Sequence, residues 1–164
     1  PDAECWSWHR AGNSVGWVRR RQAHEALIHR VDAELATGQL SAIDPVLATD
    51  GIDEILRVML DASDLPEWAS FDPTGPVAAV ETTDGHSWTM QMGRFTGTSP
   101  NTGTAYDDPV LRLGDGLAPG TILRGDPVDI DLWLWGRGPS DHIDVTGDRL
   151  VVDLIRQAAI AGTQ

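Results

Sequence analysis

The sequence predicts an α+β protein, and three observations lead to this fold class. A long segment from Ser14 to Gly38 has the composition and the ends of a single helix. Two strand-like segments on either side of the turn Thr83-Asp84-Gly85 predict a β-hairpin. Strand-like segments then precede helical ones instead of alternating with them, which favours an α+β arrangement over a doubly wound parallel sheet.

The chain divides into a helical part over residues 1–62, a linker over residues 63–75 and a small antiparallel-sheet α+β domain over residues 76–164. In the helical part, Ser14 can cap the start of the long helix and Gly38 can adopt the left-handed conformation at its end. Two shorter helices are expected to follow over residues 43–48 and 50–60. The linker contains Pro66 and Pro73, which argue against regular structure there.

In the second part, five segments carry a regular pattern. Strands are expected over residues 77–82, 86–92, 110–113, 121–124 and 142–145, and an irregular loop over residues 93–108. A helix from Asp126 to Trp135 is apolar on nearly all sides, which predicts that it is buried. A closing helix is expected over residues 150–161.

The composition excludes several classes of partner. The chain has 164 residues and a formal net charge of −13. Such an acidic chain is not expected to bind nucleic acid or an anionic membrane. No apolar run approaches the length of a transmembrane helix, so no membrane partner is expected.

The first thirteen residues are expected to form a loop. Trp6 and Trp8 are its expected packing anchors, because two exposed indoles would leave a large apolar surface in water. Cys5 is the only cysteine, which excludes an internal disulfide and fits a reducing, cytoplasmic location. No base can be assigned to Cys5, so we interpret it as a structural or incidental thiol. The abrupt, Met-less start suggests that the chain is a piece of a longer protein.

One stripe of the long helix carries a carboxylate and an imidazole. Glu25 and His29 are four residues apart, so their side chains lie one above the other, and Asp32 follows one turn later. An apolar ridge at helical spacing runs beside this stripe: Ile28, Val31 and Leu35. The stripe therefore borders the buried side of the helix.

Two interpretations of Glu25 and His29 remain open from spacing alone. They could bind a divalent metal, as carboxylate-plus-histidine pairs do in helix bundles. They could equally form an ordinary hydrogen bond on a solvated helix face. The zinc-protease motif HExxH is excluded, since three residues separate Glu25 from His29. Zinc needs at least three protein ligands, so the others would come from upstream residues or from another chain.

Three blocks of sequence, in a fixed order, carry a resemblance to a known family. They are Trp6-Ser7-Trp8, residues 19–34 (RRRQAHEALIHRVDAE) and residues 48–54 (ATDGIDE). Together they resemble the mycothiol-dependent maleylpyruvate isomerase family. Residues 132–137 (LWLWGR) and 145–148 (VTGD) resemble its C-terminal domain, which is similar to sterol-carrier-type α+β domains.

The resemblance implies a metal site that this chain completes only in part. Family members begin with a DinB-like four-helix bundle, and residues 1–62 would be the C-terminal part of that bundle. A divalent metal, usually zinc, is held there by a histidine from an earlier helix together with the positions of Glu25 and His29. The third ligand would lie upstream of Pro1. Asp32 is a candidate to orient His29, the alternative being an ion pair with an arginine.

The implied chemistry uses mycothiol as a thiol cosubstrate. A thiol bound to zinc loses its proton and becomes a nucleophile toward a small-molecule electrophile, for isomerisation or for transfer. The resemblance assigns Arg137 as the catalytic cation that meets developing negative charge, the alternative being a cap of the preceding helix. Arg21 is expected to be a structural partner of Glu25.

Two other functions stay open from the sequence. By analogy with sterol carriers, the α+β part could be a small-molecule or lipid-binding module without catalysis, with its ligand around Trp88, Trp133 and Trp135. Alternatively, the long helix could serve only to associate with a further segment or with a second copy of the chain. The sequence does not identify a substrate.

Overall fold

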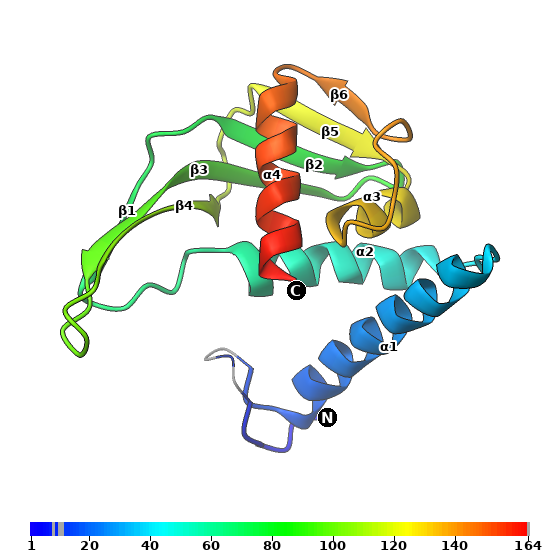
Figure 1. Ribbon diagram of the computed structural model, residues 1–164, viewed down its shortest axis with the longest axis horizontal. Helices are drawn as coiled ribbons and strands as arrows, with labels where there is room; N and C mark the ends of the chain where they lie inside the picture. Colours follow the sequence, from blue (N-terminus) through cyan, green and yellow to red (C-terminus); the bar gives the residue numbers. More distant parts are fainter. Residues whose placement is uncertain (8, 10–11, 164) are drawn as a thin grey trace.

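The computed structural model describes residues 1–7, 9 and 12–163. Its helical elements are α1 (Val15–Thr37), α2 (Pro45–Glu54), the π-helical segment η1 (Ile55–Leu60), α3 (Pro127–Leu134) and α4 (Arg149–Gly162). Its strands are β1 (Ala69–Asp72), β2 (Val77–Thr82), β3 (Ser87–Thr98), β4 (Ala105–Leu113), β5 (Thr121–Gly125) and β6 (Asp144–Thr146). The predicted α+β class is confirmed: a long N-terminal helix precedes one mostly antiparallel sheet (Figure 1).

Helix α1 begins and ends where its capping residues predict. The Ser14 hydroxyl accepts a hydrogen bond from the Trp17 N–H, and Gly38 takes a φ of 72° beyond the last turn. Figure 1 shows α1 lying obliquely beside α2, outside the layer formed by the sheet and the other helices. Its contact with α2 and α3 is a small apolar cluster of buried residues: Leu27, Val31, Ile43, Ala48 and Leu132.

Helix α2 corrects the prediction of two short helices over residues 43–60. Asp44 accepts a hydrogen bond from the Val46 N–H and Pro45 occupies the first turn, but the helix then runs on through residue 54 into η1. Gly51 lies in its middle, where a Cβ would come within 2.6 Å of an Asp131 oxygen on α3. The glycine that weakens the helix pattern in the sequence therefore permits α2 and α3 to approach closely.

The sheet is built around the long strand β3. Its first half pairs antiparallel with β2, its second half with β1, and β4 runs along the other side of both halves. Strand β5 is parallel to β2, and β6 pairs antiparallel with β5. The antiparallel sheet that the sequence predicts is thus confirmed for most strand pairs, and the β2–β5 pair is a parallel exception.

Two segments expected to be irregular are strands. Residues 69–72 of the predicted linker form β1, and residues 93–98 and 105–108 of the predicted loop form the outer halves of β3 and β4, joined by a turn over residues 99–104. These three outer segments extend away from the helices (Figure 1). An aromatic cluster stabilises them, in which Trp68, Phe95 and Tyr106 have ring centroids 5.6–5.7 Å apart.

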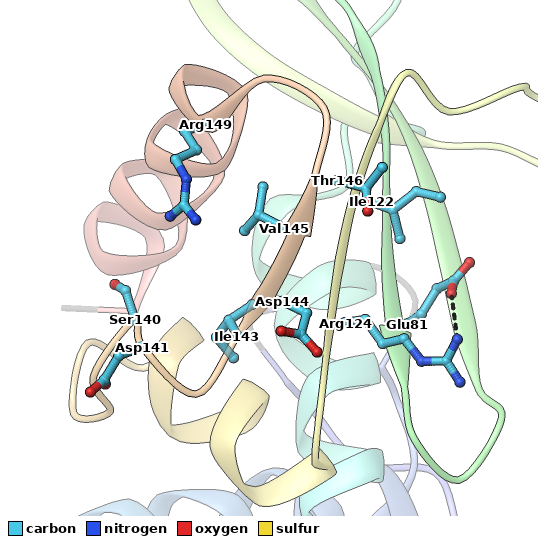
Figure 2. Close-up of a pocket in the computed structure, with 10 residues that line it drawn as sticks. All are labelled: Glu81, Ile122, Arg124, Ser140, Asp141, Ile143, Asp144, Val145, Thr146 and Arg149. Carbon is cyan, nitrogen blue, oxygen red and sulfur yellow. Dashed lines mark ion pairs between the residues drawn. The ribbon is translucent and has the colours of Figure 1, made fainter.

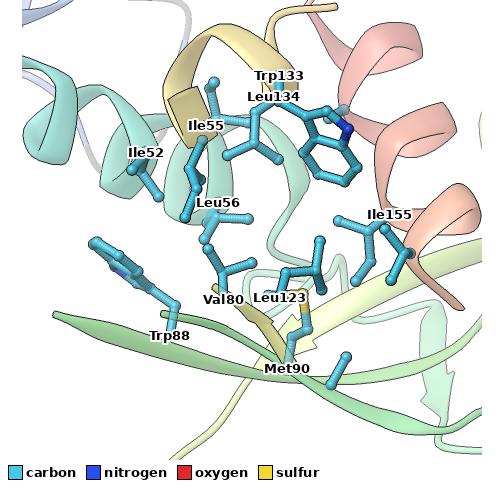
Figure 3. Packing of buried hydrophobic residues seen from close by; sticks show 14 of the residues in the cluster. Ile52, Ile55, Leu56, Val80, Trp88, Met90, Leu123, Trp133, Leu134 and Ile155 are labelled. Atoms are coloured by element: carbon cyan, nitrogen blue, oxygen red, sulfur yellow. The ribbon is translucent and has the colours of Figure 1, made fainter. Parts of the chain in front are cut away.

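The main core lies between one face of the sheet and the helical elements, mainly α2, η1, α3 and α4. Figure 3 shows Ile55 and Leu56 of η1, Trp133 of α3 and Ile155 of α4 meeting the sheet residue Leu123 across this layer. The helix from Asp126 to Trp135 is buried, as its all-round apolar pattern predicts. Because α2 and η1 contribute to this core, the segment that follows α1 is packed firmly against the sheet.

The N-terminal segment does not follow the packing prediction. Trp6 is 86% exposed, so it anchors nothing within the described residues, and Trp8 lies outside them. Cys5 is half-buried and is a free thiol. Among the described helices, none combines the length and the apolar character that crossing a bilayer requires.

Candidate functional site

Glu25 and His29 meet on the surface of α1. Glu25 Oε2 lies 3.4 Å from His29 Nε2, and the two side chains are 39% and 76% exposed. The predicted stripe is therefore formed, and it is open to solvent along its His29 side. Ile28 and Val31 beside it are buried, whereas Leu35 is 46% exposed, so the apolar ridge is buried only at its first two residues.

The distance between these two atoms can be compared with a zinc site. With metal–ligand bonds of about 2.0–2.1 Å in tetrahedral geometry, two ligand atoms lie about 3.3–3.5 Å apart. The observed 3.4 Å fits this separation without movement of either side chain. The same distance also fits a solvated Glu–His pair without a metal. No group of three potential metal ligands occurs among the residues that the structure describes. The described residues thus offer two suitable donors of the three or more that zinc needs.

The second oxygen of Glu25 is held by Arg21. The Arg21 guanidinium donates to Glu25 Oε1 from one nitrogen and to the buried Glu54 on α2 from another. Arg21 itself is buried, and its guanidinium lies over the Trp135 ring, 5.6 Å from the centroid. The predicted pairing of Arg21 with Glu25 is present, and it leaves Glu25 Oε2 turned toward His29.

Arg137 reaches the same stripe from the end of α3. Its Nε and Nη2 donate to the two carboxylate oxygens of Asp32, each at 2.9 Å, and its Nη1 donates to the Trp135 carbonyl. The hydrogen bond from Arg137 lowers the pKa of Asp32 against the opposing effect of burial, and the charge of His29 lowers it further. Arg137 therefore caps the end of α3 and also binds Asp32, which lies one turn after His29 on the same stripe of α1.

The sequence interpretation missed a polar network on the neighbouring face of α1. His24 is buried and its Nε2 lies 2.7 Å from Asp50 Oδ2, while Arg20 donates to Asp50 and to Asp53. Trp88 on β3 donates to Asp53 at 2.9 Å. This network joins α1, α2 and the sheet. The many Asp and Arg residues in segments 19–32 and 48–54 were the available sign of such a network. The paired residues are more than twenty positions apart, however, so no local spacing in the sequence reveals which of them pair.

Asp131 is the most unusual titratable group of the described chain. It is 1% exposed, and neither carboxylate oxygen has a partner in hydrogen-bond geometry among the described residues. Burial raises the pKa of Asp131 well above its ordinary value; the nearby Trp135 side chain opposes the rise and the charge of Glu54 adds to it. Burial also raises the pKa of Glu54, against the charge of Arg21. Burial therefore favours the protonated form of Asp131.

A cavity of about 800 Å³ lies at the other end of the molecule, around the edge strand β6. Figure 2 shows Arg149 on the α4 side of β6 and Arg124 on the other side, where Arg124 pairs with Glu81 at 4.0 Å. The two cations do not converge on one point, so this cavity has no built anion site. None of the predicted site residues lines it.

The three tryptophans around which a ligand was expected are packed into the fold and do not surround one common cavity. Trp133 and Trp135 are packed in the core, and Trp88 is buried with its indole N–H bonded to Asp53. The Trp133 N–H is likewise satisfied, by the Ser140 hydroxyl at 3.2 Å. Trp133 and Trp135 therefore stabilise the fold, whereas Trp88 also lines two surface hollows, one of them together with Val46 and Thr49.

Fold and site together define a class of protein in which a helix bearing a carboxylate and an imidazole is joined to an α+β domain that presents an arginine to it. Comparison with known families gives the particular family. The family model described as MDMPI C-terminal domain matches residues 46–154, more than half of the chain, so the chain belongs to the mycothiol-dependent maleylpyruvate isomerase family. No curated protein and no solved structure matches the chain.

The matched range has two consequences for the earlier expectations. It begins at residue 46, within the segment predicted as the end of a helical bundle, and so includes α2 and η1 with the sheet. It also includes Arg137 but neither Glu25 nor His29. Family membership implies the involvement of mycothiol.

Proposed function

We propose that this chain is the part of a metal- and thiol-dependent isomerase or transferase that supplies two metal ligands and a catalytic cation. The observation that carries the proposal is the 3.4 Å separation of Glu25 Oε2 and His29 Nε2, on a stripe that Arg137 also reaches through Asp32. Zinc is the metal and mycothiol the thiol in this proposal. Glu25 and His29 are the metal ligands and Arg137 is the catalytic residue.

In this proposal Glu25 and His29 have distinct roles in binding the metal. Zinc, when bound, would convert the thiol of mycothiol into a thiolate at neutral pH. Glu25 is suited to bind through one oxygen only, because Arg21 holds the other. His29 would bind as the neutral imidazole through Nε2. Both ligands stand on one turn of a helix whose buried side is fixed by Leu27 and Val31, so their separation is set by the backbone.

Arg137 would bind the negative charge of the electrophile. A guanidinium has five N–H groups, and three of them are used by Asp32 and the Trp135 carbonyl, which leaves two for a carboxylate or a developing enolate. The Asp32 carboxylate holds the planar group in one orientation and preserves its charge, since the pair raises the pKa of Arg137 further. Such a preorganised cation stabilises charge that develops during reaction.

The remaining metal ligand would come from outside the described residues. We propose a segment that precedes residue 1 in the intact protein, or a second chain, which packs on the free side of α1 and completes a helical bundle. The open side of His29 favours this arrangement, because a ligand from another helix could approach there. The substrate would be a small electrophilic molecule, and no nucleic acid or membrane is involved in this proposal.

Metal analysis of the intact protein tests the proposal. We expect about one zinc per chain in the wild type and a loss of most of it in Glu25→Gln and in His29→Ala. His142→Ala is the matched control, because His142 is also an exposed histidine paired with a carboxylate, at 3.1 Å from Asp129. Arg137→Met should keep the metal and lose turnover. A metal-free wild type, or equal metal in His29→Ala, would contradict the proposal.

A further inference from the structure

A groove of about 440 Å³ runs between α4 and the sheet, away from the candidate metal site. One wall is the side of α4 that carries Leu154 and Ala158, and the other is formed by Met92 of β3 and Val110 of β4. Pro76 lies at one end, in the loop before β2. Figure 1 shows α4 crossing the sheet over β3, which is where the outer halves of β3 and β4 leave the helices. The groove has the size of ordinary small-molecule sites.

The lining of this groove is aliphatic. Among the described residues, its walls contain leucine, valine, alanine, proline and methionine but no aromatic ring. A methionine side chain adapts its shape readily, so Met92 can follow the outline of a flexible chain. Flat aromatic ligands usually stack on aromatic walls. The lining therefore favours an elongated aliphatic ligand over a ring system.

The polar groups at the rim favour an uncharged ligand. Arg94 lines the groove, but its Nε and Nη2 already donate to the side chain and the carbonyl of Asp107, and the charge of Asp108 acts on it as well. The other polar residues at the rim are Thr74 and Gln157, which offer a hydroxyl and an amide. The whole chain carries a net charge of −13. A carboxylate headgroup would thus meet a neutralised arginine in an acidic surrounding.

Two leucines of α4 are exposed, one in the groove and one beside it. Leu154, which lines the groove, is 47% exposed, and Leu150, one turn earlier and outside the lining, is 70% exposed. Exposed apolar positions one turn apart are typical of a surface that contacts another molecule. A second copy of the chain is disfavoured as that molecule, because two acidic chains repel each other.

We propose that this groove binds an uncharged, elongated aliphatic molecule with a small polar head, such as a long-chain alcohol or amide. The aliphatic part would lie between α4 and the β3–β4 pair. The head would bond to Gln157 or Thr74 at the rim. The site is separate from the stripe on α1, so it does not depend on the proposed metal chemistry.

Fluorescence of the neutral dye Nile red tests this site, with the complete 164-residue chain as the protein. We expect saturable binding of about one dye per chain, and displacement by 1-dodecanol. Dodecanoate at pH 8 should displace it at least about tenfold less well, a difference of about 1.4 kcal/mol. Ala158→Trp should weaken dye binding by about tenfold or more, because the indole would occupy the groove.

Two further variants and one hydrodynamic measurement keep the test decisive. Ala161→Phe narrows the groove from an exposed position at the end of α4 and should also weaken binding, which covers the case that Ala158→Trp fails to fold. Leu150→Trp adds the same indole on α4 outside the groove lining and should bind as the wild type does. Unchanged binding in Ala161→Phe, stronger displacement by dodecanoate than by dodecanol, or binding that requires a dimer in light scattering would overturn the proposal.

Discussion

The Arg137 guanidinium and the Asp32 carboxylate form a bidentate ion pair, with both N···O distances at 2.9 Å, between residues 105 positions apart in the sequence. One partner stands on α1 and the other just after α3. The pair therefore fixes the position of the long helix relative to the α+β layer. It also explains how a residue in the matched C-terminal domain comes to stand beside Glu25 and His29.

The first prediction concerns the strength of this pair. In a double-mutant cycle with Asp32→Asn and Arg137→Met, we expect a coupling of about 0.5–1 kcal/mol at pH 7, because both side chains are partly exposed. The pKa of Asp32 is lowered in the folded protein, so the coupling is present above the unfolded pKa and is lost as the pH falls through the folded one. Urea unfolding at several pH values measures it. Additive single variants at pH 7 would contradict the prediction.

A second prediction follows from the buried Asp131. Its pKa is raised in the folded protein, so its contribution to stability is fully present below the unfolded pKa, near 3.8, and is lost as the pH rises toward the folded value. In the variant Asp131→Asn the side chain cannot ionise, so this variant does not lose that stability as the pH rises. We expect the variant to be more stable than the wild type by about 1–3 kcal/mol at pH 8, with the advantage shrinking toward pH 4.

Chemical unfolding of both proteins between pH 4 and pH 8 checks this prediction. Asp129→Asn is the matched control, because Asp129 lies on the same helix but is half-exposed and paired with His142. The control should follow the pH profile of the wild type far more closely than Asp131→Asn does. Parallel profiles for Asp131→Asn and the wild type would show that Asp131 does not carry the pH dependence.

The third prediction tests the approach of α2 to α3. Gly51→Ala places a Cβ within 2.6 Å of Asp131 Oδ1, and neither helix can move without opening the buried cluster around it. We expect a loss of about 1–3 kcal/mol, although alanine is the better helix former. The double variant Gly51→Ala, Asp131→Ala should recover part of that loss, since the clashing carboxylate is gone. Thermal or urea unfolding gives both values, and a stabilised single variant would refute the packing argument.

The parts of the fold that the sequence predicted are those with local causes. Ser14 and Gly38 end α1 through their own backbone and side-chain preferences, and the turn at residues 83–85 joins two alternating strands. The outer halves of β3 and β4 were missed because Gly, Thr and Pro there imitate a loop. They are strands because Trp68, Phe95 and Tyr106 pack together, which is a tertiary effect.

In the candidate site, too, the features with local causes were predicted and those that depend on tertiary contacts were not. Helical spacing alone places Glu25 beside His29, so the sequence predicted their contact. Family resemblance, and not spacing, singled out Arg137, and its roles as cap and as site neighbour prove to be compatible. The contact between Arg21 and Glu54 joins residues 33 positions apart on two helices, so no local pattern could predict it.

The last prediction is that the 164-residue chain by itself binds zinc weakly and has no turnover. Two ligands satisfy only half of a tetrahedral site, and the exposed His29 side chain must be held in one orientation to bind. In a titration of zinc followed by NMR of the histidine side chains, we expect His29 to shift in fast exchange and His142 to stay unchanged. A chelating indicator should remove the metal completely.

Glu25→Gln should abolish the His29 shift, while Asp129→Asn should leave it intact, since Asp129 lies on α3 and pairs with His142. Addition of the segment or chain that supplies the third ligand should convert the weak site into one that retains zinc against the indicator. Tight zinc binding or turnover by the chain alone would mean that its own residues complete the site, and the requirement for an outside ligand would then be wrong.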